Sequence, residues 1–366
     1  MTQRSKLDEV QARLDEIDRE ILRQVERRAR VVQDLVALRA ESAKFAPIVD
    51  GGRVAALEKA VAAPVDPRSI RPIFAAIDAA CRVQELSPRI AVVGAEGGFS
   101  WLAAATHFGP RAEPLRCETP DKALEEVSRG HAEFALVVYE TLREGLAFST
   151  ISAIASHDLR LVGEREVVHV LSLLSKSGQA SEVERIYVAP SHHVLVEQFL
   201  ETRFPKASVI DVRSAAVAWD LAAENHGAAA VVPRGLSGHE QLSVVAESIA
   251  DEGEIRVRYG VVSRTPMSRT GSDATALLFS VPDHPGALHD VLEEFKTRSC
   301  NLRRIQSRAV PGEGWEYVFY VEVGGHVTDR PLVSALEGVK KKTRMLKIVG
   351  SFPLIEAEPP QSGDAR

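Results

Sequence analysis

Side chains and backbone groups that could do chemistry occur in three stretches of this 366-residue chain. In the first stretch, arginines such as Arg28 alternate with acidic residues along a helical pattern. In the second, Glu140 and Tyr259 are polar groups that could act as acid or base. In the third, Gly286 precedes an amphipathic segment, and a glycine at a helix start lets a carboxylate approach the first backbone amides. The third stretch therefore predicts a site for a small acid.

Several common catalytic motifs do not occur in the sequence. Residues 94–98 are glycine-rich but lack the context of a dinucleotide-binding loop, and no phosphate loop, metal-ligand cluster or nucleophile elbow stands out. We therefore expect no cofactor and no metal. Cys81, Cys117 and Cys300 are far apart and odd in number, which predicts buried thiols. His192 and His193 begin a helical segment and are expected at the surface.

The composition limits the class of protein. Hydrophobic residues make up 45% of the chain, and the length allows two or three domains with sizeable cores. A net charge of -6 gives no reason to expect a nucleic-acid or membrane partner. No apolar run approaches the length of a membrane-spanning helix, and the first residues do not resemble a signal peptide. We expect a cytoplasmic protein.

The elements that must position the first stretch are helices. Apolar residues recur every three or four positions between Leu7 and Leu38, which predicts one helix of about 30 residues. Two shorter helices are expected at about 53–62 and 69–84. So long a helix cannot bury its apolar stripe within so small a domain, so we expect a homodimer or a higher homo-oligomer.

The second stretch alternates strands and helices. Strands are expected at 90–93, 134–138 and 159–162, and a second set begins near Arg185, with strands at 208–212 and 228–232 and helices at 194–200 and 215–224. The chain returns to the first set at about 255–262. Two such lobes joined by crossovers predict a hinged cleft, as in periplasmic binding proteins.

The third stretch has the order strand, helix, strand, strand, helix, strand. Leu288, Val291, Leu292 and Phe295 form one apolar stripe of a helix that follows a strand at 275–281. Strands at 302–307 and 315–323, a helix at 331–342 and a strand at 345–349 complete the unit. This order is that of a ferredoxin-like α+β fold.

Three short motifs occur in this unit, at Gly286 to Leu288, Asn301 to Leu302 and Gln306 to Arg308. They resemble those of the regulatory ACT domain of the P-proteins, the bifunctional chorismate mutase–prephenate dehydratases of phenylalanine biosynthesis. The resemblance implies a phenylalanine-binding dimer interface, and the closing Gly350 to Pro353 also fits the family. The family has glutamate where this chain has Gln306, so phenylalanine should bind more weakly here. The implied regulatory residues are Gly286, Ala287, Leu288, Asn301, Leu302, Gln306, Ser307 and Arg308.

The helical stretch resembles the all-α AroQ chorismate mutases. That enzyme rearranges a dicarboxylate, and the resemblance implies that Arg28 and Arg53 would hold carboxylates. Two family residues are replaced, by Gln11 and Val54, and we expect weak mutase activity. The implied catalytic residues are Arg28, Arg39, Asp50, Arg53 and Glu85.

The strand-and-helix stretch resembles prephenate dehydratase, a two-lobed α/β domain. Val257 stands where the family has its catalytic threonine, and a valine methyl group cannot donate a proton. The residues expected in its cleft are Glu140, Thr141, Ser172, Val257, Arg258 and Tyr259.

The sequence thus predicts a mutase-like domain at 1–86, a dehydratase-like domain at 87–267, an ACT domain at 272–356 and a flexible tail at 357–366. Three functions stay open. The chain could be a bifunctional enzyme with adapted residues that acts on chorismate and prephenate. It could be a non-catalytic regulatory paralogue that binds phenylalanine or a prephenate-like acid. It could also catalyse a changed reaction on a related cyclohexadiene acid, with Glu140 or Tyr259 as acid or base.

Overall fold

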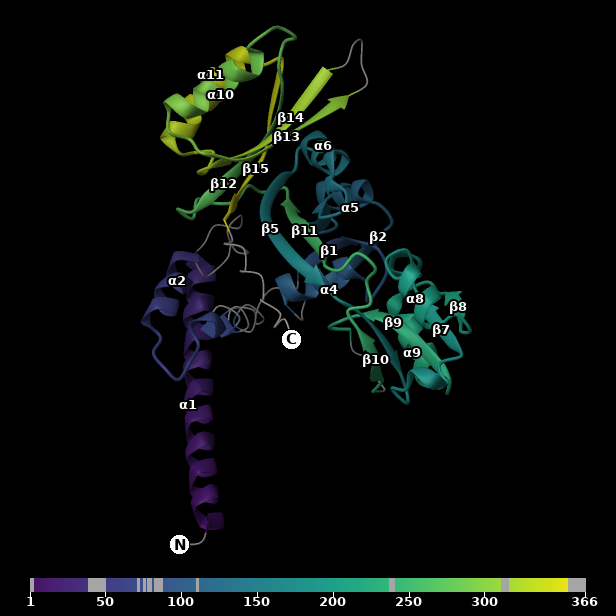
Figure 1. The fold of residues 1–366 in the computed structure, drawn as a ribbon. Helices are drawn as coiled ribbons and strands as arrows, with labels where there is room; N and C mark the ends of the chain where they lie inside the picture. The colour runs from purple at the N-terminus through teal and green to yellow at the C-terminus, as the bar shows by residue number, and fades with distance from the viewer. Residues whose placement is uncertain are drawn as a thin grey trace. The chain divides into compact units, whose positions relative to one another are not determined.

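The chain divides into two compact units, residues 1–87 with 108–111, and residues 88–107 with 112–366. The computed structural model describes residues 3–38, 51–70, 73, 74, 77, 81, 88–109, 112–236, 241–310 and 316–354. The elements of the chain are labelled in Figure 1.

The described residues of the first unit contain helices and turns and no strand. The helices with described bounds are α1 (Gln3–Leu38), α2 (Gly51–Ala60) and the short 3-10 helix η2 (Pro67–Ser69), and residues 70, 73, 74, 77 and 81 are helical as well. The long helix predicted from the periodicity is confirmed, and Figure 1 shows it as one continuous rod. Apolar residues of α1, among them Leu14 and Ile21, are more than half exposed in the single chain. The described helices fit the predicted all-α domain, which stays a prediction as a whole.

The second unit begins with a lobe built on a mixed six-stranded sheet. The order is β2-β1-β3-β11-β5, with β4 paired to β3. Strand β11 is antiparallel to both of its neighbours, β3 and β5. The strands are β1 (Arg89–Val93), β2 (Glu113–Cys117), β3 (Phe134–Thr141), β4 (Gly145–Leu146), β5 (Arg160–His169) and β11 (Ile255–Ser263), and the helices are α4 (Phe99–Phe108), α5 (Pro120–Ser128) and α6 (Phe148–Ser156).

A second lobe is built on a five-stranded sheet of order β10-β6-β9-β7-β8. The chain enters it from β5 to β6 and leaves it from β10 to β11, so two crossovers join the lobes, as predicted. The helix predicted at 194–200 is wrong in detail, because residues 194–196 form a turn between α7 (Pro190–His193) and α8 (Glu197–Arg203). The strands are β6 (Leu171–Ser175), β7 (Arg185–Val188), β8 (Ser208–Asp211), β9 (Ala228–Pro233) and β10 (Ser243–Glu247), and the helices are η3 (Ala180–Glu182), α7 (Pro190–His193), α8 (Glu197–Arg203) and α9 (Ala215–Glu224).

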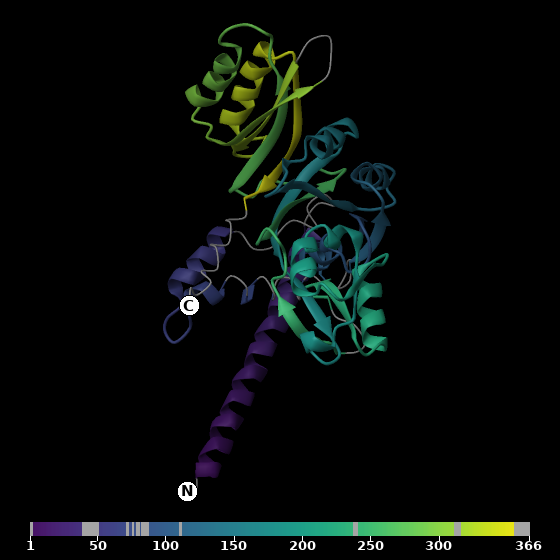
Figure 2. The same cartoon turned by 45° about the vertical axis from the view of Figure 1, so that its right-hand side comes forward.

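The C-terminal domain confirms the predicted ferredoxin-like order. Its four strands pair antiparallel as β13-β14-β12-β15, and Figures 1 and 2 show both helices on one face of the sheet. Apolar residues of the helices, such as Val291 and Leu332, form a core with Leu277 and Phe279 of the sheet. The elements are β12 (Asp273–Ser280), α10 (Ala287–Thr297), β13 (Leu302–Val310), β14 (Glu316–Gly324), α11 (Arg330–Lys342) and β15 (Met345–Pro353).

The C-terminal sheet also packs against the first lobe. Tyr139 and Leu161 of that lobe belong to the same buried core as Ala276 and Phe352 of the C-terminal sheet. At the point of closest approach, a Cβ atom on Gly350 would lie 2.1 Å from the Leu161 carbonyl oxygen, so only glycine fits. The two domains of the second unit therefore share one packed interface.

Candidate functional site

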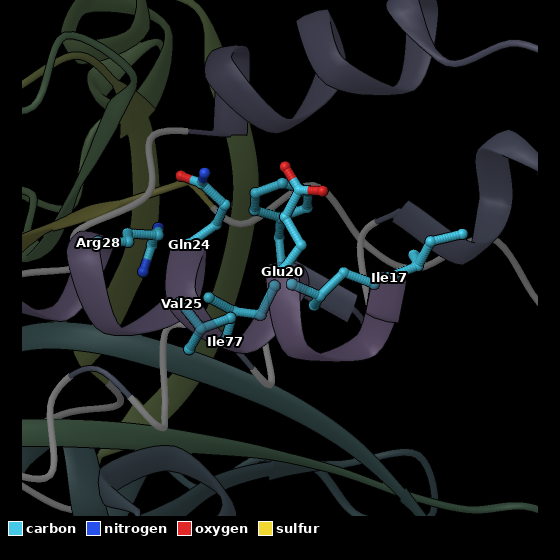
Figure 3. A pocket seen from close by; sticks show the side chains of 8 residues that line it. Ile17, Glu20, Gln24, Val25, Arg28 and Ile77 are labelled. Atoms are coloured by element: carbon cyan, nitrogen blue, oxygen red, sulfur yellow. The ribbon is translucent and has the colours of Figure 1, made fainter. Parts of the chain in front are cut away.

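A cavity of about 370 Å³ lies along α1 in the first unit. In Figure 3, Glu20, Gln24 and Arg28, spaced four residues apart, follow one side of the helix. The cavity is mostly apolar, with one carboxylate and one guanidinium, so it could hold a ring compound with an acidic group. Its lining residues are Ile17, Glu20, Ile21, Gln24, Val25, Arg28, Phe74 and Ile77.

Most of the predicted mutase residues cannot be placed against this cavity. Arg39, Asp50 and Glu85 lie outside the described residues, and so does the side chain of Arg53, which belongs to α2. Arg28 is therefore the predicted mutase residue that the structure places in the cavity. The apolar lining on α1, from Ile17, Ile21 and Val25, belongs to the same periodic stripe that predicts a dimer.

Apart from the cavity, a cluster of charged side chains joins the first lobe to the C-terminal domain. We call its five residues, Glu140, Glu164, Arg258, Arg304 and Glu322, the interdomain ionic cluster. Arg258 donates to Glu140 at 2.9 Å and to Glu164, and its Nη1 atom lies 3.6 Å from Glu322. Arg304 donates to both carboxylate oxygens of Glu140. Each of these side chains is about four-fifths buried or more, so the charges interact with little screening.

Two tyrosine hydroxyls donate hydrogen bonds to carboxylates of the interdomain ionic cluster. Tyr139 donates to Glu164 at 2.6 Å, and Tyr320 donates to Glu322 at 2.8 Å. Burial raises the pKa of Glu164, although the Arg258 charge and the Tyr139 hydrogen bond oppose it. The Arg258 guanidinium also lies 5.2 Å from the centre of the Tyr139 ring. Arg258 is thus surrounded by partners at the interface with the C-terminal sheet.

A cluster of ring side chains lies at the junction of the two lobes. We call Phe99, His169, His192 and Tyr259 the interlobe cluster. Phe99 stacks on His169 with ring centroids 4.2 Å apart and lies 4.7 Å from His192. Tyr259 and His169 form a hydrogen bond of 2.8 Å between the hydroxyl and Nε2. Four different elements, α4, β5, α7 and β11, bring these rings together.

The polar members of the interlobe cluster are uncharged at neutral pH. Burial lowers the pKa of both His169 and His192 to about 4. Burial also raises the pKa of Tyr259 well above its ordinary value, and a hydrogen bond with Ser100 only partly opposes this. The surface position expected for His192 is wrong, since the side chain is 2% exposed. The sequence carried no signal for this burial, because it gives two adjacent histidines that look alike. The structure buries His192 and leaves His193 partly exposed.

The residues predicted for the dehydratase cleft do not form one site: they are divided between the interdomain ionic cluster, the interlobe cluster and separate strands. Glu140 and Arg258 belong to the interdomain ionic cluster, and Tyr259 belongs to the interlobe cluster. Val257 is 6% exposed and lies opposite Thr141 in the register of β11 and β3. Ser172 is buried in β6 of the second lobe. Sequence reasoning missed Glu164, Arg304, Glu322, Phe99 and His169, whose partners are far away along the chain.

The predicted regulatory residues lie in, or directly before, two elements of the C-terminal domain, α10 and β13. Gly286 has a φ of +87° directly before α10, a backbone conformation that favours glycine, and Ala287 and Leu288 begin the helix. Asn301 precedes β13, which carries Leu302 and the segment from Gln306 through Ser307 to Arg308. Arg308 lies 5.9 Å from the ring centre of Phe148, in α6 of the first lobe.

Other chemical features can be stated for the described part of the chain. Cys81, Cys117 and Cys300 are buried free thiols, as predicted. Among the described residues, no group of three or more His, Cys, Asp or Glu side chains could hold a metal ion. Within the same residues, no helix has both the length and the apolar character that crossing a membrane requires.

Comparisons with known proteins agree with this architecture. The prephenate dehydratase family model matches residues 90–267, and the ACT domain model matches residues 275–340. The bifunctional chorismate mutase/prephenate dehydratase of Aquifex aeolicus is 32% identical over 356 residues, which cover 95% of this chain and 98% of that protein. The prephenate dehydratase of Amycolatopsis methanolica is 31% identical over 271 residues, covering 72% of this chain and 88% of that protein.

A solved structure is similar as well. Prephenate dehydratase from Arthrobacter aurescens, crystallised in complex with L-Phe, is 29% identical, with a TM-score of 0.60 over 73% of this chain and 90% of that one. The resemblance inferred from the motifs is therefore confirmed by similarity that extends over nearly the full length. This chain belongs to the family of bifunctional chorismate mutase/prephenate dehydratases with a C-terminal ACT domain.

Proposed function

We propose that this chain is a regulatory member of its family, which binds phenylalanine or a related acid through its ACT domain and does not dehydrate prephenate. Dehydration of prephenate expels hydroxide with loss of carbon dioxide, so a side chain must protonate the leaving oxygen. Val257, at the position of the family's threonine, has no proton to give. Arg258 directly follows Val257, and the contacts of its guanidinium group are the observation that carries the proposal.

Arg258 is the one residue of the family's Thr-Arg-Phe motif that this chain keeps, and its guanidinium is already bound. Its two terminal nitrogens donate to Glu140 and Glu164, at the face of the sheet that packs against the ACT domain. To hold a substrate carboxylate, Arg258 would have to leave these buried partners uncompensated, which is costly. Glu140 is equally unsuited to act as an acid, because Arg258 and Arg304 both stabilise its charged form.

Binding by the ACT domain is supported by a different set of observations. The segments expected to contact a ligand, at Gly286 and at Gln306 to Arg308, belong to a domain with the ferredoxin-like pairing. The related Arthrobacter aurescens protein was crystallised with L-Phe. Gln306 cannot form an ion pair with a ligand ammonium group, so we expect weaker binding of phenylalanine than in relatives that have glutamate there.

We also propose that two copies associate through α1. This helix leaves much of its apolar stripe exposed in the single chain, and a second copy would bury it. The domain limits 1–86, 87–267 and 272–356 are part of the same proposal. Sedimentation of the full chain would test it, since a monomer at micromolar concentration would contradict the proposed dimer.

The proposed function is tested by two measurements on the full chain. Prephenate is incubated with and without protein, and phenylpyruvate is quantified; we expect no formation above the spontaneous rate. Phenylalanine, tyrosine and phenylpyruvate are titrated calorimetrically into the wild type, and we expect at least one to bind. Gly286→Val should abolish this binding, because a branched side chain disfavours the positive φ at that position.

Gly324→Ala is the matched control, since an added Cβ there makes only an ordinary contact at 3.6 Å. Enzymatic formation of phenylpyruvate would overturn the regulatory function and support an active dehydratase. Failure of all three compounds to bind a folded chain would reduce the ACT domain to an assembly device.

A further inference from the structure

Alternate residues of β13 lie on the face of the ACT sheet that packs against the first lobe. Gln306 is opposite Tyr320 in the register of β13 and β14, and Tyr320 belongs to the buried core that the sheet shares with that lobe. Arg304 and Arg308 both contact the first lobe, Arg304 through an ion pair and Arg308 through an aromatic ring. Side chains two positions apart on a strand lie on the same face. The half-buried Gln306 is therefore flanked by two arginines.

The two faces of β13 offer different surroundings. Ile305 lies opposite Val321, which belongs to the core beneath the two ACT helices. The Ile305 side chain is 44% exposed. Residues paired across two strands share one face of the sheet, so Ile305 and Gln306 lie on opposite faces. A charge introduced at position 305 is thus on the other side of the sheet from one introduced at position 306.

The carboxylates that face Arg304 are already bound. Arg304 donates to both carboxylate oxygens of Glu140. Glu322 lies 3.8 Å from Arg304 and accepts a hydrogen bond from Tyr320. Arg308 is exposed, and its described contact is with an aromatic ring rather than with a carboxylate. A ligand ammonium group on this face would have to compete with a guanidinium group for a buried carboxylate, which is costly.

The side-chain amide of Gln306 is uncharged and carries both a donor and an acceptor. Its NH₂ group can donate a hydrogen bond to a carbonyl oxygen of a ligand. An ammonium group at the same place would meet only the neutral amide oxygen, with an arginine Cα about 7 Å away in each direction along the strand. Because like charges brought together lower affinity, these surroundings favour a ligand oxygen over a ligand ammonium group.

We propose that the ligand of the ACT domain is an aromatic 2-oxo acid rather than the corresponding 2-amino acid. Gln306 donates to the 2-oxo group, and the flanking arginines Arg304 and Arg308 disfavour an ammonium group at that position. This inference rests on the proposed function, in which the ACT domain binds an acid, and it adds the chemical class that the domain selects. It concerns a choice between two acids, so it can fail while the proposed function stands.

Calorimetric titration of the full chain with phenylpyruvate and phenylalanine tests the proposal, because these acids share the ring and the carboxylate and differ at the 2-position. We expect phenylpyruvate to bind at least about tenfold more tightly. Phenylalanine binding as tightly as phenylpyruvate, or more tightly, would overturn the proposal and leave the proposed function intact. Binding by neither acid, nor by tyrosine, to a folded chain would overturn both.

Hydrocinnamate, the same acid with no group at the 2-position, separates the two parts of the argument. It lacks the ammonium charge and also the oxygen that Gln306 would bond. We therefore expect its affinity to fall between those of phenylpyruvate and phenylalanine. Hydrocinnamate binding no more tightly than phenylalanine would contradict the repulsion assigned to the two arginines.

A charge reversal at Gln306 should reverse the selection. Gln306→Glu places a carboxylate between the two arginines, so phenylalanine should bind about tenfold more tightly and phenylpyruvate about tenfold more weakly than in the wild type. Ile305→Glu is the matched control, because it adds the same charge on the opposite face of β13 and should keep the preference for phenylpyruvate. An unchanged preference in Gln306→Glu, or the same reversal in Ile305→Glu, would contradict the role of Gln306.

A neutral variant guards against misfolding. Gln306→Met keeps a side chain of similar length without charge and removes the amide that donates to the 2-oxo group. Phenylpyruvate should bind about fivefold more weakly to this variant, whereas the affinity for hydrocinnamate should stay as in the wild type. Retained hydrocinnamate binding shows that the site is folded. Wild-type affinity for phenylpyruvate in such a variant would refute the proposed hydrogen bond.

Discussion

Arg304 of β13 binds both carboxylate oxygens of Glu140 on β3, so one strand of the ACT domain and one strand of the dehydratase-like domain share an ion pair. The two side chains are 21% and 13% exposed. Arg258 contacts the same glutamate from β11. Glu140 therefore lies between two guanidinium groups that come from different domains.

Replacing Arg304 by glutamine should destabilise the chain. The change leaves the buried carboxylates of Glu140 and Glu322 with Arg258 as their remaining described cation, and breaking such a pair costs about 3 kcal/mol of unfolding free energy. Arg256→Gln is the control, because Arg256 pairs with Glu166 and Glu254 in more exposed surroundings and should cost under about 1 kcal/mol. Urea unfolding measures both, and equal losses would contradict the prediction.

Gly350→Ala should loosen the ACT domain from the first lobe. The new Cβ would meet the Leu161 backbone, which cannot move aside alone, so we expect a loss of about 1–3 kcal/mol. Cleavage by trypsin at Arg264 and Arg269, between the domains, should become faster. Gly324→Ala lies in the same sheet without such a contact and should be cleaved like the wild type.

Stability should fall as the pH drops from about 6.5 toward 4. His169 and His192 have pKa values of about 4 in the folded chain against an ordinary 6.5, so in this window the unfolded chain binds protons that the folded chain does not. Each histidine should then contribute a loss of about 1.4 kcal/mol per pH unit. Unfolding free energies measured between pH 7 and 5 should show a shallower slope for His192→Leu. An identical slope in wild type and variant would argue against a buried neutral imidazole.

Chorismate mutase activity should be weak in the wild type. By resemblance to the AroQ enzymes, Gln11 and Val54 replace a carboxylate-binding arginine and a glutamate that accepts the substrate hydroxyl. Gln11→Arg with Val54→Glu should raise the rate of chorismate conversion by about 10² or more if the remaining arginines are in position. Ala12→Arg with Val54→Glu puts the arginine on a neighbouring face of α1 and should not. A wild-type rate like that of ordinary mutases would refute the prediction.

The sequence by itself determined the features that depend on local periodicity. The apolar spacing from Leu7 to Leu38 produced α1, and the stripe around Val291 with its flanking strands produced the ferredoxin-like order. Both follow because side-chain direction repeats every 3.6 residues in a helix and every 2 in a strand. The family resemblance also followed from the sequence, since its motifs are short contiguous runs.

Only the tertiary structure decided which polar residues meet. Arg258 and Tyr259 are adjacent in sequence, yet they join different clusters, because neighbouring side chains of a strand point to opposite faces. Arg304 is 164 positions from Glu140, so no local pattern could pair them. His192 and His193 look alike in sequence, but the Phe99 ring covers one of them and solvent reaches the other, because packing between lobes is a property of the whole fold.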